Sequence, residues 1–188
     1  MRNVFLSLLL ICQVANLYSQ KKVVQFKTSN EYLDFIKKEF KIPSNEMFYI
    51  STENDSLNLQ LEKFGIMLFV TDGKIATVQE VAEILNTQCS PKHLLPKVTE
   101  DAIQQASTPS NAFEKLILKN LENGTKLNSE SSKYALYTFS YRFGKNAKMY
   151  YNERKEIEAL GYKTIVITID GAYIDELADI DKTPVHVQ

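Results

Sequence analysis

The chain has 188 residues and a formal net charge of -1 at pH 7, with 22 Lys and Arg residues balanced by 23 Asp and Glu residues. This near-neutral composition, without a basic cluster, argues against nucleic acid and against an anionic membrane surface as partners. The length suits a single domain of ordinary size that buries its own core.

Residues 1–19 have the parts of a secretory signal peptide. A basic head at Arg2 precedes an apolar run and a polar end that contains the small residue Ser19. The apolar run is too short to span a bilayer, so we expect cleavage after Ser19, a periplasmic or secreted product, and no membrane span in the mature chain. The alternative is a lipid anchor on Cys12, for which Ile11 is unfavourable because bacterial lipoprotein signals have a small residue there.

Helix and strand signals alternate in the N-terminal half of the mature chain. Thr28 and Glu31 have the spacing of a capping box, in which both side chains satisfy free amides at the start of a helix. Asp72 and Gly73 separate two apolar runs, which is typical of a β-hairpin because glycine adopts the positive φ of a primed turn. We expect strands at 23–26, 47–50, 66–70 and 75–77, and helices from Thr28 to Phe40, from Asp55 or Ser56 to Phe64, and from Thr77 to Leu85.

The C-terminal half is predicted to begin with a helical insertion, at about 86–124, that prolines break into short pieces. Its last helix is expected from Ser110 to Leu121. A strand-helix-strand unit follows, with a strand at 134–139, a helix at 145–160 and a strand at 164–169. Such a unit implies parallel strands, so the sequence predicts a single α/β domain at 20–188, with a mixed sheet and helices on both faces.

Two stretches resemble pieces of the thioredoxin fold. Residues 136–170, in which Thr138-Phe139-Ser140-Tyr141 leads into a helix, resemble the first strand, active-site helix and second strand of the thiol-disulfide oxidoreductases. Residues 51–80 resemble the later part of a thioredoxin, where Lys63-Phe64-Gly65-Ile66 precedes the hairpin. The resemblance implies a thioredoxin-like fold. The two pieces stand in the opposite order to the family's, so either the domain is rearranged or one resemblance is a coincidence.

The resemblance also has departures that concern activity. Phe143-Gly144-Lys145-Asn146 stands where the family has C-x-x-C, and Ile66 runs directly into Met67 where the family has a cis-proline. Neither sulfur position can form a thiolate or a disulfide, so the exchange chemistry of a low-pKa thiolate and a second cysteine cannot operate there. We therefore expect a redox-inactive relative of that fold.

The turn after the first strand of the unit is the candidate binding site. Arg142, Lys145 and the free amides at a helix start could accept a carboxylate or an extended peptide. In the structural alternative, Phe143 fills the space of the missing disulfide and the charges are only solvated. The candidate binding residues are Tyr141, Arg142, Phe143, Lys145 and Asn146 in the turn, and Asp170 at the end of the second strand, where open α/β sheets bind ligands. The binding interpretation predicts an exported protein that captures a peptide or a partner protein in the cell envelope.

Cys89 is the only cysteine that remains after signal cleavage, so no internal disulfide can form. It could be buried and inert, paired with another chain, or reactive. With His93 as a base it would be the candidate catalytic residue of a monothiol oxidoreductase or peroxidase-like enzyme. Its position after a predicted helix C-terminus argues against this, because that end of the helix dipole disfavours a thiolate. A structural envelope protein is the third functional class.

The sequence offers few ligands for a metal or a cofactor. His93 and His186 are the only histidines, which is too few for a zinc site built mainly from nitrogen and sulfur. The acidic residues between 170 and 181 lack the alternation of a calcium loop. The chain has neither a Gly-rich phosphate loop nor a Gly-x-Ser-x-Gly elbow, so we expect no metal and no cofactor.

Overall fold

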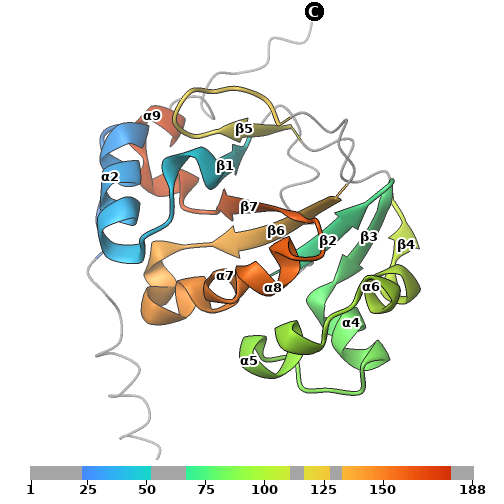
Figure 1. Cartoon of the computed structure of the whole chain (residues 1–188). Helices are drawn as coiled ribbons and strands as arrows, with labels where there is room; N and C mark the ends of the chain where they lie inside the picture. Colours follow the sequence, from blue (N-terminus) through green and yellow to red (C-terminus); the bar gives the residue numbers. More distant parts are fainter. Residues whose placement is uncertain (1–22, 52–66, 111–116, 128–132, 179–188) are drawn as a thin grey trace, which may run out of the picture.

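The structure is a computed structural model, which describes residues 23–51, 67–110, 117–127 and 133–178 (Figure 1). The predicted signal peptide, Cys12, the helix expected after Asp55 and His186 lie outside the described residues. None of the helices among the described residues combines the length and the hydrophobicity that a membrane span requires.

Seven strands of the described residues form one mixed sheet in the order β4-β3-β2-β6-β7-β1-β5. Their bounds are β1 (Met47–Ile50), β2 (Met67–Thr71), β3 (Lys74–Thr77), β4 (Thr108–Pro109), β5 (Leu118–Asn120), β6 (Lys133–Phe139) and β7 (Lys163–Thr168). β6 and β7 are parallel, as are β7 and β1, and the other neighbouring pairs are antiparallel. The prediction of an α/β fold with a single mixed sheet is therefore confirmed.

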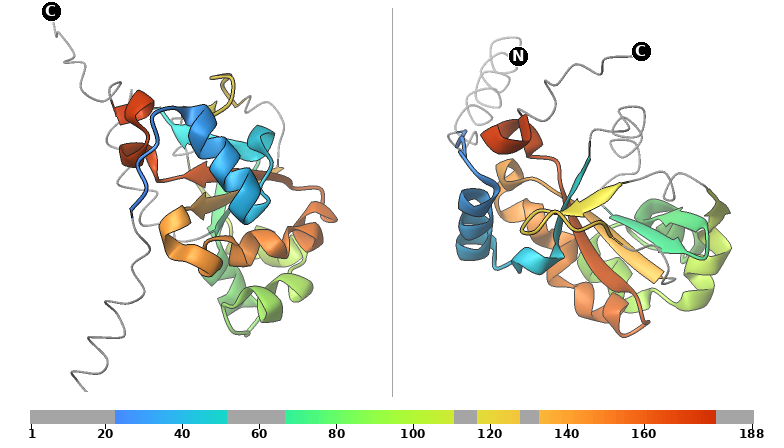
Figure 2. Two further views of the ribbon diagram at one scale, coloured as in Figure 1. Left: turned by 90° about the vertical axis from the view of Figure 1, so that its left-hand side faces the viewer. Right: turned by 90° about the horizontal axis from the view of Figure 1, so that it is seen from above.

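The helices are short, apart from α2. The α-helices are α2 (Ser29–Phe40), α4 (Val78–Ile84), α5 (Pro91–Leu94), α6 (Glu100–Ala106), α7 (Met149–Asn152), α8 (Arg154–Glu158) and α9 (Asp175–Ala178). The 3-10 helices are η1 (Ser44–Glu46), η3 (Leu95–Lys97), η4 (Tyr141–Lys148) and η5 (Gly171–Tyr173). Figures 1 and 2 show α2 (blue) at one end of the sheet and α4 to α6 (green) at the other.

Local sequence signals explain where several elements begin and turn. Thr28 caps α2 by accepting a hydrogen bond from the Glu31 amide, and Thr77 forms a complete capping box with Glu80 at α4. β2 and β3 form the predicted hairpin, in which Asp72 (φ 47°) and Gly73 (φ 71°) both adopt the positive φ of a primed turn. β2 also pairs with β6, so the hairpin lies beside the strand-helix-strand unit.

Alternation along the strands divides the core between the two faces of the sheet. Ala135, Tyr137 and Phe139 of β6 belong to a large apolar cluster that also contains the buried side chains of the helices. The second cluster consists of strand residues, namely Phe48, Leu68, Val70, Leu118, Tyr134, Leu136, Ile165 and Ile167. The described helices thus contribute to one face. The expected helices on the second face stay a prediction, and the helix expected after Asp55 lies outside the described residues.

Three predicted elements differ from the structure. The helix expected at 145–160 is wrong as one continuous element, because η4, α7 and α8 replace it and the backbone leaves helical angles at Lys148 (φ -119°, ψ 20°) and Glu153 (φ -98°, ψ 15°). The helix expected from Ser110 to Leu121 is wrong at its end, where β5 pairs with β1. The strand expected at 23–26 is reduced to a single bridge between Phe26 and Ile174.

Candidate functional site

The parallel strands β6 and β7 end side by side, with Phe139 opposite Thr168. The carboxyl ends of parallel strands are where open α/β sheets bind ligands. Ser140 and η4 follow β6 at this edge, and Asp170 follows β7. The structure therefore brings Asp170 next to the predicted binding turn.

Asp170 is the centre of a buried hydrogen-bond network. It is only 1% exposed. Its Oδ1 accepts a hydrogen bond from the Ser140 hydroxyl (2.5 Å), and its Oδ2 accepts from the Tyr141 amide (2.9 Å) and the Tyr32 hydroxyl (2.7 Å). The carboxylate thus fixes the first two residues after β6 to the end of β7.

Tyr32 extends the network into α2. Its hydroxyl lies 2.7 Å from Thr168 Oγ1, which in turn accepts a hydrogen bond from the Asp170 amide (3.1 Å). Burial raises the pKa of the Asp170 carboxyl, although the bonds from Ser140, Tyr141 and Tyr32 act in the opposite direction. Burial, and then the negative charge of Asp170, raise the pKa of Tyr32 well above its ordinary value, so its hydroxyl keeps its proton and serves as a donor.

Tyr141 is a core residue. It is 1% exposed, and its ring lies edge-on to Phe26 and Phe35 at centroid distances of 5.7 Å. Its hydroxyl donates to the Val24 carbonyl (2.9 Å) and accepts from the Val24 amide (3.1 Å). The Tyr141 side chain therefore packs into the core and anchors the turn, and it is not on the surface that a partner would contact.

Arg142 lies on that surface and has a fixed position. Its guanidinium lies over the Tyr173 ring, 5.1 Å from the centroid, and its Nη1 donates to the Tyr173 hydroxyl (2.7 Å). The amide of Arg142 donates to the Ser140 hydroxyl oxygen (3.3 Å). Because Arg142 remains exposed, this anchored cation is accessible to a partner.

Phe143 is the most exposed large apolar residue of the described chain, at 58%. The structural alternative, in which Phe143 fills the space of a missing disulfide, is therefore wrong. Gly144 follows with its positive φ, and Asn146 is exposed in the same 3-10 helix, which also contains Lys145. The turn thus contains an exposed aromatic residue directly after an arginine whose guanidinium is anchored.

Cys89 contacts α7, the helix that directly follows η4. The thiol is exposed, and its Sγ is 3.4 Å from the Tyr150 hydroxyl, which donates to the Cys89 carbonyl (2.9 Å). Burial raises the pKa of Tyr150. His93 Nδ1 interacts with the Ser90 hydroxyl at 2.6 Å, so the polar contact that the structure describes for this imidazole is with Ser90 and not with the thiol.

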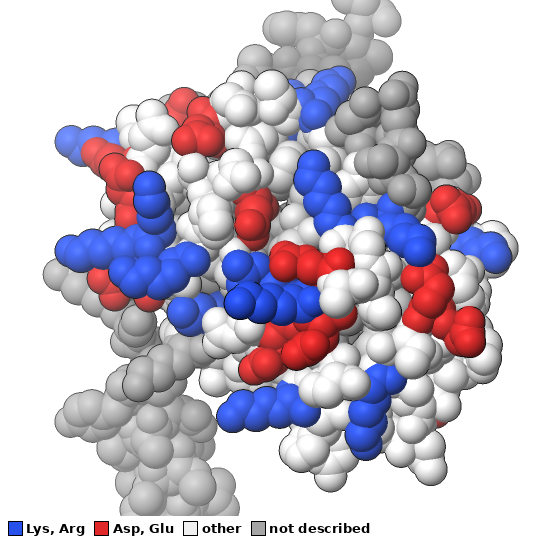
Figure 3. Space-filling view, in the orientation of Figure 1, with Lys and Arg blue, Asp and Glu red and all other residues white. Residues whose placement is uncertain are grey.

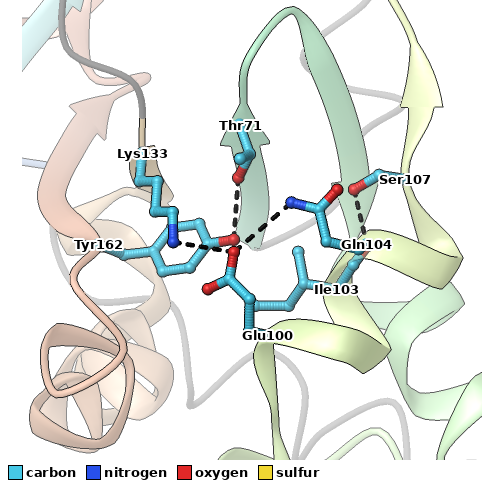
Figure 4. Close-up of polar contacts among 7 residues, drawn as sticks. All are labelled: Thr71, Glu100, Ile103, Gln104, Ser107, Lys133 and Tyr162. Atoms are coloured by element: carbon cyan, nitrogen blue, oxygen red, sulfur yellow. Dashed lines mark hydrogen bonds and ion pairs between the residues drawn. The ribbon is translucent and has the colours of Figure 1, made fainter.

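A second polar cluster lies at the opposite end of β6 and β7, where Tyr162, Thr71, Lys133 and Glu100 point toward one another (Figure 4). The Tyr162 hydroxyl is buried 2.8 Å from Thr71 Oγ1. Lys133 Nζ forms an ion pair with Glu100 (2.8 Å). These contacts attach α6 to the sheet, and their partners are all within the chain.

The described residues lack the side-chain groups of a metal site. Among them, no group of three or more His, Cys, Asp and Glu side chains could hold a metal ion. On the face drawn in Figure 3, positive and negative side chains are interspersed. The turn at Arg142 and Phe143 is therefore the clearest candidate for binding.

Sequence reasoning missed the residues that hold Asp170. Tyr32 is 138 positions away from it, and only the fold brings the two together. Ser140 could have been found, since a serine directly after a buried strand is a common cap for the next helix.

In comparisons with known proteins, the chain matches no family model, no curated protein and no solved structure.

Proposed function

We propose that this protein is an exported, redox-inactive, thioredoxin-like binding protein whose η4 turn captures a peptide or a partner protein in the cell envelope. The observation that carries the proposal is the exposure of Phe143, the residue directly after Arg142, whose guanidinium is anchored on Tyr173. Aromatic residues and arginine are both enriched at the cores of protein interfaces.

The sheet supports the thioredoxin-like part of the proposal. The two stretches that resemble a thioredoxin are neighbours in the sheet, because β2 of the hairpin pairs with β6 of the strand-helix-strand unit. This adjacency favours one rearranged domain over the alternative that one resemblance is a coincidence. Phe143 and Asn146, at the sulfur positions of the family motif, are both exposed, so the site keeps its access to partners without the thiols.

The chemistry of the turn indicates the class of ligand. Arginine forms charge-assisted, bidentate hydrogen bonds with carboxylates, and the attachment of Arg142 to Tyr173 lowers the side-chain entropy lost on binding. Phe143 can cover an apolar side chain next to that carboxylate. We infer a peptide segment that carries an acidic residue near an apolar one.

The test compares matched variants in partner capture. Immobilised wild type, Arg142→Ala and Phe143→Ala are incubated with a cell-envelope extract, and bound proteins are quantified after crosslinking. Lys163→Ala and Ile84→Ala are the controls, because Lys163 is exposed on β7 and Ile84 is 46% exposed on α4, both outside the turn. We expect both turn variants to lose a partner that both control variants retain. Equal capture by all five proteins would exclude the turn.

A monothiol enzyme is the second candidate, and the exposure of Cys89 favours it. Since a thiol reagent should label the exposed thiol in the folded protein, labelling alone does not decide the matter. Turnover of a peroxide or a disulfide substrate that is lost in Cys89→Ser would establish this function. Equal, background rates for wild type and Cys89→Ser would exclude it.

A further inference from the structure

Tyr137, in the middle of β6, has a buried hydroxyl without a hydrogen-bond partner. The residue is 2% exposed and belongs to the apolar cluster on the helix-covered face. Among the described residues its hydroxyl has no hydrogen bond. Buried polar groups in folded proteins are nearly always paired, with protein or with ordered water, so this group indicates an occupant.

The groups around Tyr137 come from α7, α8 and η1. The Tyr151 ring is edge-on to the Tyr137 ring, at a centroid distance of 6.1 Å, and its hydroxyl donates to Glu46 Oε2 (2.7 Å). The guanidinium of Arg154 covers the Tyr151 ring at 4.2 Å. Burial is the main cause of the raised pKa of Tyr137. The next largest effects are the charge of Glu158, which raises this pKa, and the charge of Arg154, which lowers it.

Arg154 adds a second buried atom without a hydrogen bond. Its Nε is buried and makes no hydrogen bond within the described chain. Its ion-pair partner Glu158 Oε1 lies 3.4 Å away, with the Arg154 and Glu158 side chains 26% and 40% exposed, and already accepts a hydrogen bond from the Thr164 hydroxyl (2.9 Å). The Arg154 Nε–H and the Tyr137 hydroxyl thus both lack a hydrogen bond, at a site that opens toward solvent on the side of Glu158.

The charges of this cluster decide what it can hold. One guanidinium and the two carboxylates of Glu46 and Glu158 sum to -1, which disfavours an anion. Carboxylates from only these two residues are too few for a metal ion of the usual coordination. What fits is a neutral oxygen that accepts from the Arg154 Nε–H, hydrogen-bonds the Tyr137 hydroxyl and donates to a carboxylate. A buried water makes about three such bonds.

We propose that one internal water molecule occupies this site and bridges the Tyr137 hydroxyl, Arg154 Nε and the Glu158 carboxylate. The bridge would join the centre of β6 to α8, and so hold the segment that continues from the η4 turn. The site is separate from the proposed binding surface and does not depend on the function proposed for that surface.

The isosteric variant Tyr137→Phe gives opposite results with and without the water. If the water is present, removing the hydroxyl takes away one of its partners, and we expect the midpoint of thermal unfolding to fall by about 2–4 °C, the shift for one hydrogen bond in a domain of this size. If the hydroxyl has no partner, phenylalanine removes an unsatisfied buried group and the midpoint rises. A rise would overturn the proposal.

Tyr162→Phe serves as the matched control, because the Tyr162 hydroxyl bonds directly to Thr71 and its loss should lower the midpoint in either case. A crystal structure of the wild type at a resolution that shows ordered water provides the second measurement. A single peak within hydrogen-bond distance of Tyr137 Oη and Arg154 Nε, absent in Tyr137→Phe, would support the bridge. An empty site, or density for a larger molecule, would overturn it.

Discussion

Replacing Asp170 by alanine tests whether the carboxylate holds the turn. The change removes the acceptor of the Ser140 hydroxyl and of the Tyr141 amide, both of which are buried. Tyr32 keeps its contact with Thr168, so we count two donors that lose their partner.

The expected loss follows from these two donors. A buried donor left without an acceptor costs about 1–3 kcal/mol, which gives about 2–6 kcal/mol for the pair. Removing a desolvated carboxylate offsets part of this cost, as the raised pKa of Asp170 indicates. We therefore expect Asp170→Ala to lower the free energy of unfolding by about 2–3 kcal/mol.

Urea unfolding, followed by circular dichroism at neutral pH, measures this loss. The slope against urea should stay unchanged while the midpoint falls. Asp101→Ala is the matched control, because Asp101 is exposed on α6, and it should change the free energy by no more than about 0.5 kcal/mol. An Asp170→Ala midpoint equal to that of Asp101→Ala would refute the structural role of the carboxylate.

Three further predictions concern pH, the turn and the far end of the sheet. Because burial raises the pKa of Asp170 in the folded state, the stability linked to protonation of this carboxyl is fully present below the ordinary aspartate value of about 3.9 and is lost as pH rises through the folded pKa, whereas the hydrogen bonds that Asp170→Ala removes are still accepted at neutral pH. Asp170→Asn should flatten this part of the curve of unfolding free energy against pH, and an unchanged pH profile would contradict the assignment. Gly144→Ala should lower the free energy of unfolding, measured with urea, by about 1–3 kcal/mol, since the positive φ of Gly144 is strained for a residue with a Cβ. A loss smaller than that of Asp101→Ala would show that the turn relaxes. Lys133→Ala breaks the ion pair between Lys133 and Glu100, whose side chains are both partly exposed. The variant should therefore lower the unfolding midpoint only slightly, and this loss should disappear at high salt. A loss that does not depend on salt would argue for a packing role of Lys133.

Local signals in the sequence predicted the elements that need only near neighbours. The caps at Thr28 and Thr77 and the hairpin at Asp72 and Gly73 are each defined within four residues, and the structure confirms them. The parallel pairing of β6 and β7 also followed from the strand-helix-strand pattern. In these cases the physical cause is short-range.

The failures have long-range causes. The helix expected at 145–160 is interrupted because Lys148 and Glu153 adopt non-helical angles that apolar periodicity does not encode. Residues 118–120 have apolar neighbours at helical spacing, yet they pair with β1 because the sheet edge offers hydrogen bonds there. Likewise, Asp170 was a candidate from its position alone, whereas its partner Tyr32 was invisible without the fold.

The two margins of the sheet have a consequence for how this protein can meet other chains. On one side β4 has only two residues, and Pro109 lacks an amide hydrogen to donate. On the other side the outer edge of β5 is occupied by the chain itself, since the Leu127 amide donates to the Leu118 carbonyl (2.8 Å). Among the described residues, neither border offers a long row of open main-chain groups, so edge-to-edge pairing into fibrils and capture of a ligand by strand addition are both disfavoured there. The proposed capture of a partner would therefore depend on side chains.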